Sequence, residues 1–365
     1  MRKLNIISRA LIAVLCVVCI VYLPMIKLKS NDEISLIYKT FIGNKSEYQG
    51  IIEIWNIDTF ESGSASKVSF LENSAKRFQN KNKGLHFMIR NITENECLNM
   101  LKSGQLPDLF SCSYGVSGQI KDFVVKYENK KVDIYDNFLN SGKVGGEIFA
   151  LPWCTGFYSL ISTKAKLEMA KTVNNENLKD IVFSSSYHYK LGKKEKKSYS
   201  LTYGANKYLM PKNAILSYNK NSIVQTENGI DDKAASQSQY SAYCRFLTND
   251  ATILLGTQRD IIRMENRVKQ GKVSDVIYEP IVSYTDLVQF VFLAKNSDEL
   301  RKRYAEQFAL YLVSDESQSC LEGIGMFAVK HLSDVNFSGV MKDIVLDKIS
   351  DCKLFGVFDN VLEFE

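Results

Sequence analysis

Strand-like and helix-like segments alternate along residues 51–113, and this alternation constrains the fold more than any other feature of the sequence. Three of these segments are rich in β-branched and aromatic residues and are bounded by polar loops, as β-strands are. They are IIEIW at 51–55, HFMIRNI at 86–92 and DLFSCS at 108–113.

The two connections between these strands have the signs of helices. In the first connection, four apolar residues recur at the spacing of one helix face: Val68, Leu71, Ala75 and Phe78. In the second, Thr93 and Glu96 have the spacing of a capping box, and Gly104 follows as a helix terminator. The order strand–helix–strand–helix–strand predicts a parallel sheet with right-handed crossovers.

In open α/β sheets, ligands bind beyond the carboxyl ends of the strands. Two loops of this first unit lie at such ends, residues 56–63 after the first strand and residues 113–118 after the third. We therefore expect these loops to build a ligand site.

A second unit of similar type begins near Leu151. The stretch 257–260 is interpreted as a turn, and the apolar run 286–294 is typical of a strand buried on both faces. The elements expected in this part of the chain are strands at 157–162, 251–256, 286–294 and 325–330, and helices at 165–171, 240–247, 261–271 and 300–311.

The N-terminus combines a cationic start with an apolar run. Arg2, Lys3 and Arg9 precede or border residues 10–26, which are seventeen residues without a charge. This length is at the short limit for a membrane-spanning helix, and positive charge before the run favours an extracytoplasmic location for the chain after it.

Signals for cleavage of this run are weak. No A-x-A pattern follows it, and neither Cys16 nor Cys19 is preceded by the small residue that lipidation needs. We expect an uncleaved signal anchor at residues 1–30 in the cell membrane, a stalk at 31–49, and residues 31–365 on the extracytoplasmic side. A lipoprotein anchor is the alternative.

Composition excludes several classes of partner. The chain has 46 Lys and Arg against 41 Asp and Glu, and a net charge of +5 over 365 residues is too weak for a nucleic-acid-binding surface. The lysine-rich stretch 190–197 is interpreted as a solvated loop. The three histidines lack metal-ligand spacing and the cysteines after the apolar run are scattered, so we expect buried thiols, no metal and no cofactor.

Five segments, in order, resemble the sugar-binding branch of the extracellular solute-binding proteins, the substrate-capturing components of ABC importers. They span most of residues 50–330. They are IIEIWNIDTFESG, LKSGQLPDLFSCS, GEIFALPWCTGFYSLISTK, AYCRFLTNDATILLGTQRD and QFVFLAKNSDELRKRYAEQFALYLVSDESQSCL with the following GIGMFAVK.

The resemblance implies an α/β, two-lobed fold of the type II periplasmic-binding-protein class. Each lobe would be a mainly parallel sheet flanked by helices, with a transmembrane signal-anchor helix before them. Lobe 1 would comprise residues 50–150 and 287–325, and lobe 2 residues 151–286 and 326–365. The lobes would close on a small solute, which we expect to be a carbohydrate, and deliver it to ABC permease subunits.

Sugar recognition needs aromatic faces for the CH surfaces and planar polar groups for the hydroxyls. The strand-end loops and the crossings between lobes supply both kinds of side chain. The candidate ligand-binding residues are Asp58, Phe60, Glu61, Ser113, Tyr114, Trp153, Thr155, Gln258, Arg259 and Asp286. For Arg259, pairing with Glu61 or Asp58 and clamping of an acidic sugar or phosphate are both open.

Two other classes of function stay open. Asp58, Glu61 and Asp108 offer the carboxylates of a carbohydrate-active enzyme. However, GxSxG, HExxH, Walker A and GxGxxG motifs are all absent from the sequence, so we expect a protein without catalytic activity. The expected anchor also fits a membrane-tethered domain that senses a solute for a partner.

Overall fold

The computed structural model describes residues 44–128, 131–169, 178, 201–218, 237–295, 298–333, 337, 341 and 349–359. The expected anchor, residues 31–43 of the expected stalk and the lysine-rich stretch 190–197 lie outside the described residues. Among the described helices, none combines the length and apolar character needed to cross a membrane. The chain divides into two compact units, residues 1–45 with 81–83 and residues 46–80 with 84–365.

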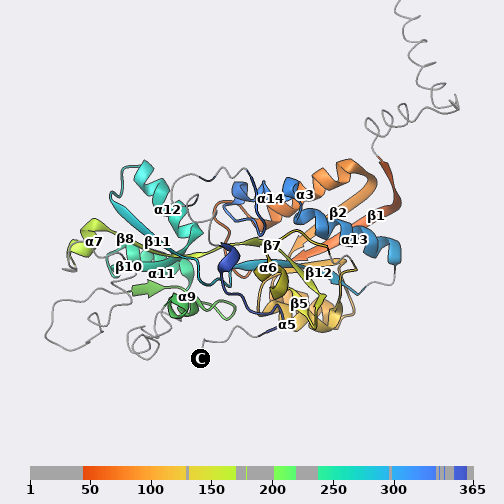
Figure 1. Ribbon diagram of the computed structural model, residues 1–365, viewed down its shortest axis with the longest axis horizontal. Coiled ribbons are helices and arrows are strands. Elements are labelled where there is room, and N and C mark those ends of the chain that lie inside the picture. The colour runs from red at the N-terminus through yellow and green to blue at the C-terminus, as the bar shows by residue number, and fades with distance from the viewer. Residues whose placement is uncertain are drawn as a thin grey trace, which may run out of the picture. The chain divides into compact units, whose positions relative to one another are not determined.

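The first sheet is mixed and has the strand order β2-β1-β3-β12-β4, with β7 also paired to β12. Figure 1 labels β1, β2, β7 and β12 of this sheet. β1 runs parallel to β3, with Trp55 opposite Phe110, whereas β12 is antiparallel to β3, β4 and β7. The strands are β1 (Asn44–Asn56), β2 (Asn82–Asn91), β3 (Leu109–Cys112), β4 (Val124–Val125), β7 (Ala150–Thr155) and β12 (Val288–Ala294).

Helices pack on this first sheet through apolar faces. α3 buries Phe70, Leu71 and Phe78, and α13 buries Phe308 and other residues at helical spacing. A two-stranded hairpin, β5 (Lys143–Val144) with β6 (Glu147–Ile148), precedes β7. The helices are α3 (Lys67–Lys81), α4 (Glu94–Lys102), α5 (Val116–Ile120), α6 (Asp136–Ser141), α13 (Glu299–Leu312) and α14 (Asp315–Gln318), with 3-10 turns at Lys121–Phe123, Leu321–Ile324 and Ile349–Asp351.

The second sheet has the order β11-β8-β10-β9. β10 is parallel to β9 and antiparallel to β8, which in turn is antiparallel to β11. Its strands are β8 (Tyr158–Thr163), β9 (Leu201–Tyr203), β10 (Ile253–Thr257) and β11 (Val276–Ile281). The accompanying helices are α7 (Lys164–Met169), α9 (Pro211–Tyr218), α11 (Gln239–Leu247) and α12 (Gln258–Lys269) (Figure 1).

Most of the elements expected from the sequence are present. The capping box of Thr93 and Glu96 is formed at the start of α4, and Gly104 follows the helix with φ +81°. Every residue of β12 is buried, as its continuous apolar character predicts. β1 begins at Asn44, so the strand extends into the segment expected to be a stalk.

The expectation of mainly parallel sheets holds in part, and two other expectations about the fold are wrong. In the first sheet β1, β3, β4 and β7 run in one direction and β12 runs against them; in the second sheet β9, β10 and β11 share a direction and β8 runs against them. Residues 257–260 do not form a turn, since Thr257 caps α12 directly through a capping box with Asp260. Residues 325–330 form no strand beyond a single bridge between Phe327 and Thr155.

Described residues near the C-terminus contact elements of the first sheet. The Tyr114 hydroxyl donates to the Phe355 carbonyl at 3.1 Å, and the Val357 amide donates to the Ser141 carbonyl at 2.7 Å. These residues were expected in lobe 2, and the lobe boundaries stay a prediction.

Candidate ligand-binding cleft

A cleft of about 620 Å³ lies where the loop after β1 meets the starts of α11 and α12. One wall is formed by residues 58–62 and 64–67, which belong to the loop after β1 and the first residue of α3. The other wall is formed by residues 205–206 after β9, residues 237–240 at the start of α11, and Arg259 in α12. The lining residues are Asp58, Thr59, Phe60, Glu61, Ser62, Ser64, Ala65, Ser66, Lys67, Ala205, Asn206, Gln237, Ser238, Gln239, Tyr240 and Arg259. Of the two loops expected to build a ligand site, the first contributes residues 58–62 to the lining of this cleft, and residues 113–118 contribute none.

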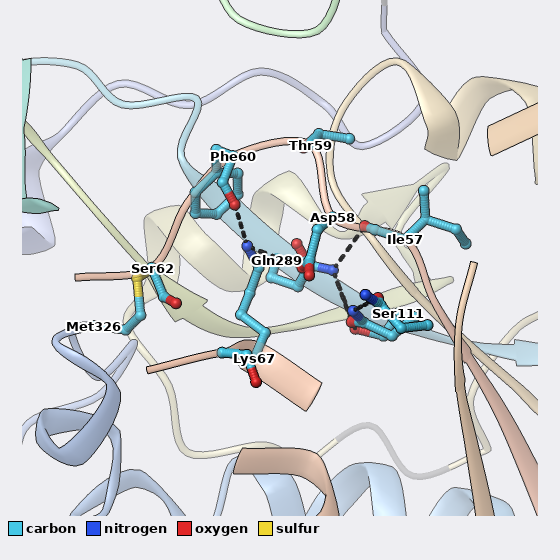
Figure 2. Close-up of polar contacts among 12 residues, drawn as sticks. Ile57, Asp58, Thr59, Phe60, Ser62, Lys67, Ser111, Gln289 and Met326 are labelled. Atoms are coloured by element: carbon cyan, nitrogen blue, oxygen red, sulfur yellow. Dashed lines mark hydrogen bonds and ion pairs between the residues drawn. The ribbon is translucent and has the colours of Figure 1, made fainter. Parts of the chain in front are cut away.

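Lys67 fixes the loop after β1 from inside the protein. Only 1% of its side chain is exposed, and its ammonium lies 3.1 Å from an Asp58 carboxylate oxygen. The same Nζ donates to the Phe60 carbonyl oxygen at 2.5 Å and lies 3.8 Å from the centre of the Phe60 ring (Figure 2). A buried ammonium needs such partners, so the loop conformation and the burial of Lys67 depend on each other.

The beginning of the loop is held by a buried amide on β12. Gln289 Nε2 lies 3.3 Å from the Ile57 carbonyl oxygen and 3.2 Å from the Ser111 hydroxyl (Figure 2). Asn56 completes this group, because its Oδ1 accepts from Ser111 Oγ at 2.9 Å. The chain at the end of β1 is therefore held in place just before the loop residues that line the cleft.

Contacts also join the loop to residues beside the second sheet. Arg259 Nη1 donates to the carbonyl oxygens of Gly63 and Ser64 at 3.0 and 3.1 Å. Asn206 Nδ2 donates to the Thr59 carbonyl oxygen at 2.9 Å. Residues from both sides thus contact one another around the cleft.

Glu61 is paired with two guanidinium groups. Its Oε2 lies 2.9 Å from Arg263 Nη2 and 3.6 Å from Arg259 Nε. Arg263 also pairs with Asp260 at 3.1 Å. Burial raises the pKa of Asp260, while the Thr257 amide and Arg263 act in the opposite direction. Of the two carboxylates that the sequence offered as partners for Arg259, Asp58 and Glu61, the structure pairs it with Glu61.

Tyr240 presents an aromatic ring at the cleft. The residue is 58% exposed although it lies in the first turn of α11, and its ring is 6.5 Å from that of Tyr243. The Arg263 guanidinium carbon lies 5.2 Å from the centre of the Tyr240 ring. Together with the carboxylates of Asp58 and Glu61, which also line the cleft, this ring supplies the mixture of apolar face and polar groups that ligand clefts use.

Of the ten candidate residues, the structure brings four to the cleft: Asp58, Phe60, Glu61 and Arg259. Asp58 and Glu61 keep 33% and 48% of their side chains exposed. Phe60 is only 5% exposed and lies under Lys67, so it contributes more to the loop's packing than to an open surface.

The other six candidates are buried and do not line the cleft. The Trp153 ring stacks on Phe70 at 5.1 Å and its Nε1 donates to Ser111 Oγ at 3.3 Å. Asp286 accepts from the Tyr158 hydroxyl at 2.7 Å and the Met210 amide at 2.6 Å, and its burial raises its pKa. The six are Ser113, Tyr114, Trp153, Thr155, Gln258 and Asp286, all at most 1% exposed.

The remaining four of these six are also part of the packed interior. Tyr114 packs its ring against Phe290 at 5.1 Å. The Gln258 Oε1 accepts from the Phe157 amide at 3.2 Å. The Thr155 hydroxyl donates to the Gly156 carbonyl at 3.1 Å, and Ser113 is fully buried.

Several lining residues were not anticipated from the sequence. Lys67 carried a readable signal, because it falls at helical spacing with buried Phe70 and Leu71 and so lies on the apolar face of α3. Ser238 stands as an N-cap before the stripe that Tyr240 and Tyr243 begin, which marks a helix start. Nothing local marks Asn206, since only the tertiary fold brings it to Thr59.

Among the described residues, no group of three or more His, Cys, Asp and Glu side chains is arranged to hold a metal ion. The lining of the cleft offers hydrogen-bond donors and acceptors, paired charges and the exposed ring of Tyr240, which are groups that small-molecule sites in proteins commonly use.

No protein-family model matches the sequence, and no curated protein matches it. Solved structures do match. A family 1 extracellular solute-binding protein from Bifidobacterium longum subsp. infantis aligns with a TM-score of 0.58 and 12% identity, over 86% of this chain and 90% of its own. The Trichodesmium protein FutA, in complex with iron and citrate, aligns with a TM-score of 0.57 and 12% identity, over 85% and 94%.

An enzyme is also among the matches. Thiaminase I from Bacillus thiaminolyticus aligns with a TM-score of 0.51 and 13% identity, over 77% of this chain and 86% of its own. At such low identity these similarities establish the fold and leave the ligand open. The chain has the two-lobed, mixed α/β fold of the type II periplasmic binding proteins.

Proposed function

We propose that this protein is an extracytoplasmic solute-binding protein that captures a carbohydrate in the cleft beside the loop after β1. The observation that supports this most is the cleft itself, which is lined from both sides by amides, hydroxyls and carboxylates around the exposed Tyr240 ring. Carbohydrates present hydroxyls at their edges and CH groups on their faces, and these features match such a lining.

The polar groups have distinct roles in this proposal. Asp58 and Glu61 are held in place by Lys67, Arg259 and Arg263, so their free oxygen positions accept sugar hydroxyls without a change in conformation. Gln239 is the first residue of α11 and provides an amide that can donate and accept.

Delivery to ABC permease subunits and anchoring through residues 10–26 belong to the same proposal. They are supported by the resemblance of the sequence and by the apolar, cation-preceded N-terminus. An anchor of this kind would hold residues 31–365 on the extracytoplasmic face of the membrane, near a permease. Co-purification of permease subunits with the chain from detergent-solubilised membranes tests this part.

A thermal-shift screen of the purified full-length chain against mono- and oligosaccharides tests the proposed function. A ligand at 100 times its dissociation constant adds about 2.7 kcal/mol to the free energy of unfolding. We expect at least one carbohydrate to raise the melting temperature and to be recovered unchanged. Conversion of the sugar into product would instead indicate an enzyme, and stabilisation only by peptides or metal ions would contradict the carbohydrate proposal.

A further inference from the structure

Arg263 lies beside the cleft and contacts a residue from each of its walls. The residue belongs to α12, is not among the residues that line the cleft, and has 19% of its side chain exposed. Glu61 is part of the loop that forms one wall, and Tyr240 is part of the helix start that contributes to the other. A single guanidinium group therefore touches both walls.

The contact with the first wall is an ion pair. Arg263 Nη2 donates to Glu61 Oε2 at 2.9 Å, whereas Arg259 Nε lies 3.6 Å from the same oxygen. Hydrogen bonds between a guanidinium and a carboxylate are stronger than bonds between neutral groups at the same distance. Of the two arginines, Arg263 therefore holds the Glu61 carboxylate more closely.

The contact with the second wall is made with aromatic rings. The Arg263 guanidinium carbon lies 5.2 Å from the centre of the Tyr240 ring and 5.3 Å from that of Tyr243, within the range of about 6 Å over which a cation is attracted to a ring face. Tyr243 is only 5% exposed, whereas Tyr240 is 58% exposed. The orientation of the exposed ring therefore depends on the guanidinium and on the buried ring beside it.

Asp260 anchors the guanidinium group to its own helix. Its Oδ1 accepts from Arg263 Nη1 at 3.1 Å, and its Oδ2 accepts from the Thr257 amide at 3.0 Å. Only 3% of the Asp260 side chain is exposed. The planar guanidinium has donors in fixed directions, so it can meet Asp260 and Glu61 through separate nitrogens while its face lies over the rings.

We infer that Arg263 is a positioning residue of the cleft, which fixes the Tyr240 ring of one wall relative to the Glu61 carboxylate of the other. The inference rests on the proposed function, since Arg263 acts on solute capture through these two lining residues. Side chains that are already held lose less conformational freedom when a solute binds, and affinity gains from this.

Fluorine NMR of the full-length chain, with 3-fluorotyrosine in place of tyrosine, tests the inference. Tyr240→Phe identifies the Tyr240 signal. We expect Arg263→Gln to move this signal, because the ring loses the guanidinium beside it. Glu61→Gln should also move it in the parent and should have no further effect in the Arg263→Gln background. A signal that Glu61→Gln leaves unmoved in the parent, or moves equally in both backgrounds, would overturn the inference.

Two further variants keep this test specific. Arg267→Gln is the matched control, because it removes the same charge one turn further along α12 and should leave the Tyr240 signal in place. If it moves the signal as far as Arg263→Gln does, the effect is one of general charge and the inference fails. Arg263→Lys covers the case in which Arg263→Gln does not fold. It keeps the charge, and it should still move the signal because an ammonium does not reproduce the guanidinium contacts; an unmoved signal would overturn the inference.

The NMR measurement needs no solute, so it separates the inference from the proposed function. If the Tyr240 signal responds as expected but no carbohydrate stabilises the chain in the thermal-shift screen, the positioning role stands and the proposed function is contradicted. If a carbohydrate stabilises the chain but the signal does not respond, the proposed function stands and the positioning role of Arg263 is overturned.

Discussion

The ammonium group of Lys67 and the carboxylate of Asp58 lie 3.1 Å apart at the base of the cleft, although only 1% of the Lys67 side chain is exposed. The pair joins the first residue of α3 to the loop after β1. The pair therefore links the packing of α3 to the conformation of the loop that lines the cleft.

Replacement of Lys67 by Met should destabilise the protein by about 3 kcal/mol, because Asp58 and the Phe60 carbonyl lose their partner. Equilibrium unfolding in urea measures this loss. The double variant Lys67→Met with Asp58→Asn should recover part of the loss, since the unpaired charge is gone. Equal losses in the single and double variants would contradict the pairing.

Trp153 should behave as a core residue. Its ring is buried and stacked on Phe70, so Trp153→Ala is expected to lower the free energy of unfolding by about 3–5 kcal/mol. Ligand affinity, measured well below the melting temperature, should change little. If Trp153→Ala has normal stability but weakened ligand affinity, the core assignment is wrong and Trp153 contacts the ligand.

Gly204 should be intolerant of a side chain. A Cβ there would lie 2.3 Å from the backbone nitrogen and Cα of Gln239, at the start of α11. Gly204→Ala should therefore cost about 1–3 kcal/mol and weaken ligand binding, because the helix start must move. Gly323→Ala is the control, since a Cβ there meets nothing within 4 Å; equal effects of the two substitutions would refute the steric argument.

Glu94 should make stability depend on acid pH. The residue is 7% exposed and is bonded to Lys207, Tyr208 and Gln119. Burial alone would raise its pKa, but these hydrogen bonds outweigh burial and hold the pKa below its ordinary value of 4.5. The contribution of the ionised Glu94 to the free energy of unfolding is therefore complete above about pH 4.5. It is lost as the pH falls through the lowered pKa.

Urea unfolding of Glu94→Gln at several pH values measures this contribution. The variant should be less stable than the parent by about 1–2 kcal/mol at pH 7, and the difference should narrow below pH 4.5. Glu299→Gln serves as a control because the Glu299 side chain is 79% exposed. A difference that stays constant down to pH 3 would contradict the assignment.

Local patterns in the sequence predict the elements well. The apolar spacing of α3, the capping box of α4 and the apolar run of β12 each depend on neighbouring residues, and all three are formed. Strand direction depends on where the chain returns from a distant segment. For this reason the sequence did not predict that β12 pairs antiparallel with β3, or that β8 pairs antiparallel with β10.

The residues of the candidate site also separate into those that local sequence patterns predict and those that they do not. Asp58 and Glu61 follow a strand directly, so the strand-end rule places them at the cleft. Aromatic residues were harder to assign, because a tryptophan in a crossing and a tyrosine on a helix do not reveal their exposure in the sequence. Trp153, a predicted ligand-binding residue, is buried, whereas Tyr240, which was expected only as part of a helix, is 58% exposed at the cleft.

The affinity of the full-length chain for its best carbohydrate, compared between the parent and Tyr240→Ala, tests the central claim most directly. Tyr240 is exposed at the cleft, so its removal should leave the melting temperature of the free protein nearly unchanged and weaken binding by about 1–3 kcal/mol. Leu300→Ala, an exposed apolar residue on α13, should change neither quantity. Equal affinity of the parent and Tyr240→Ala, or no carbohydrate binding at all, would contradict solute capture in this cleft.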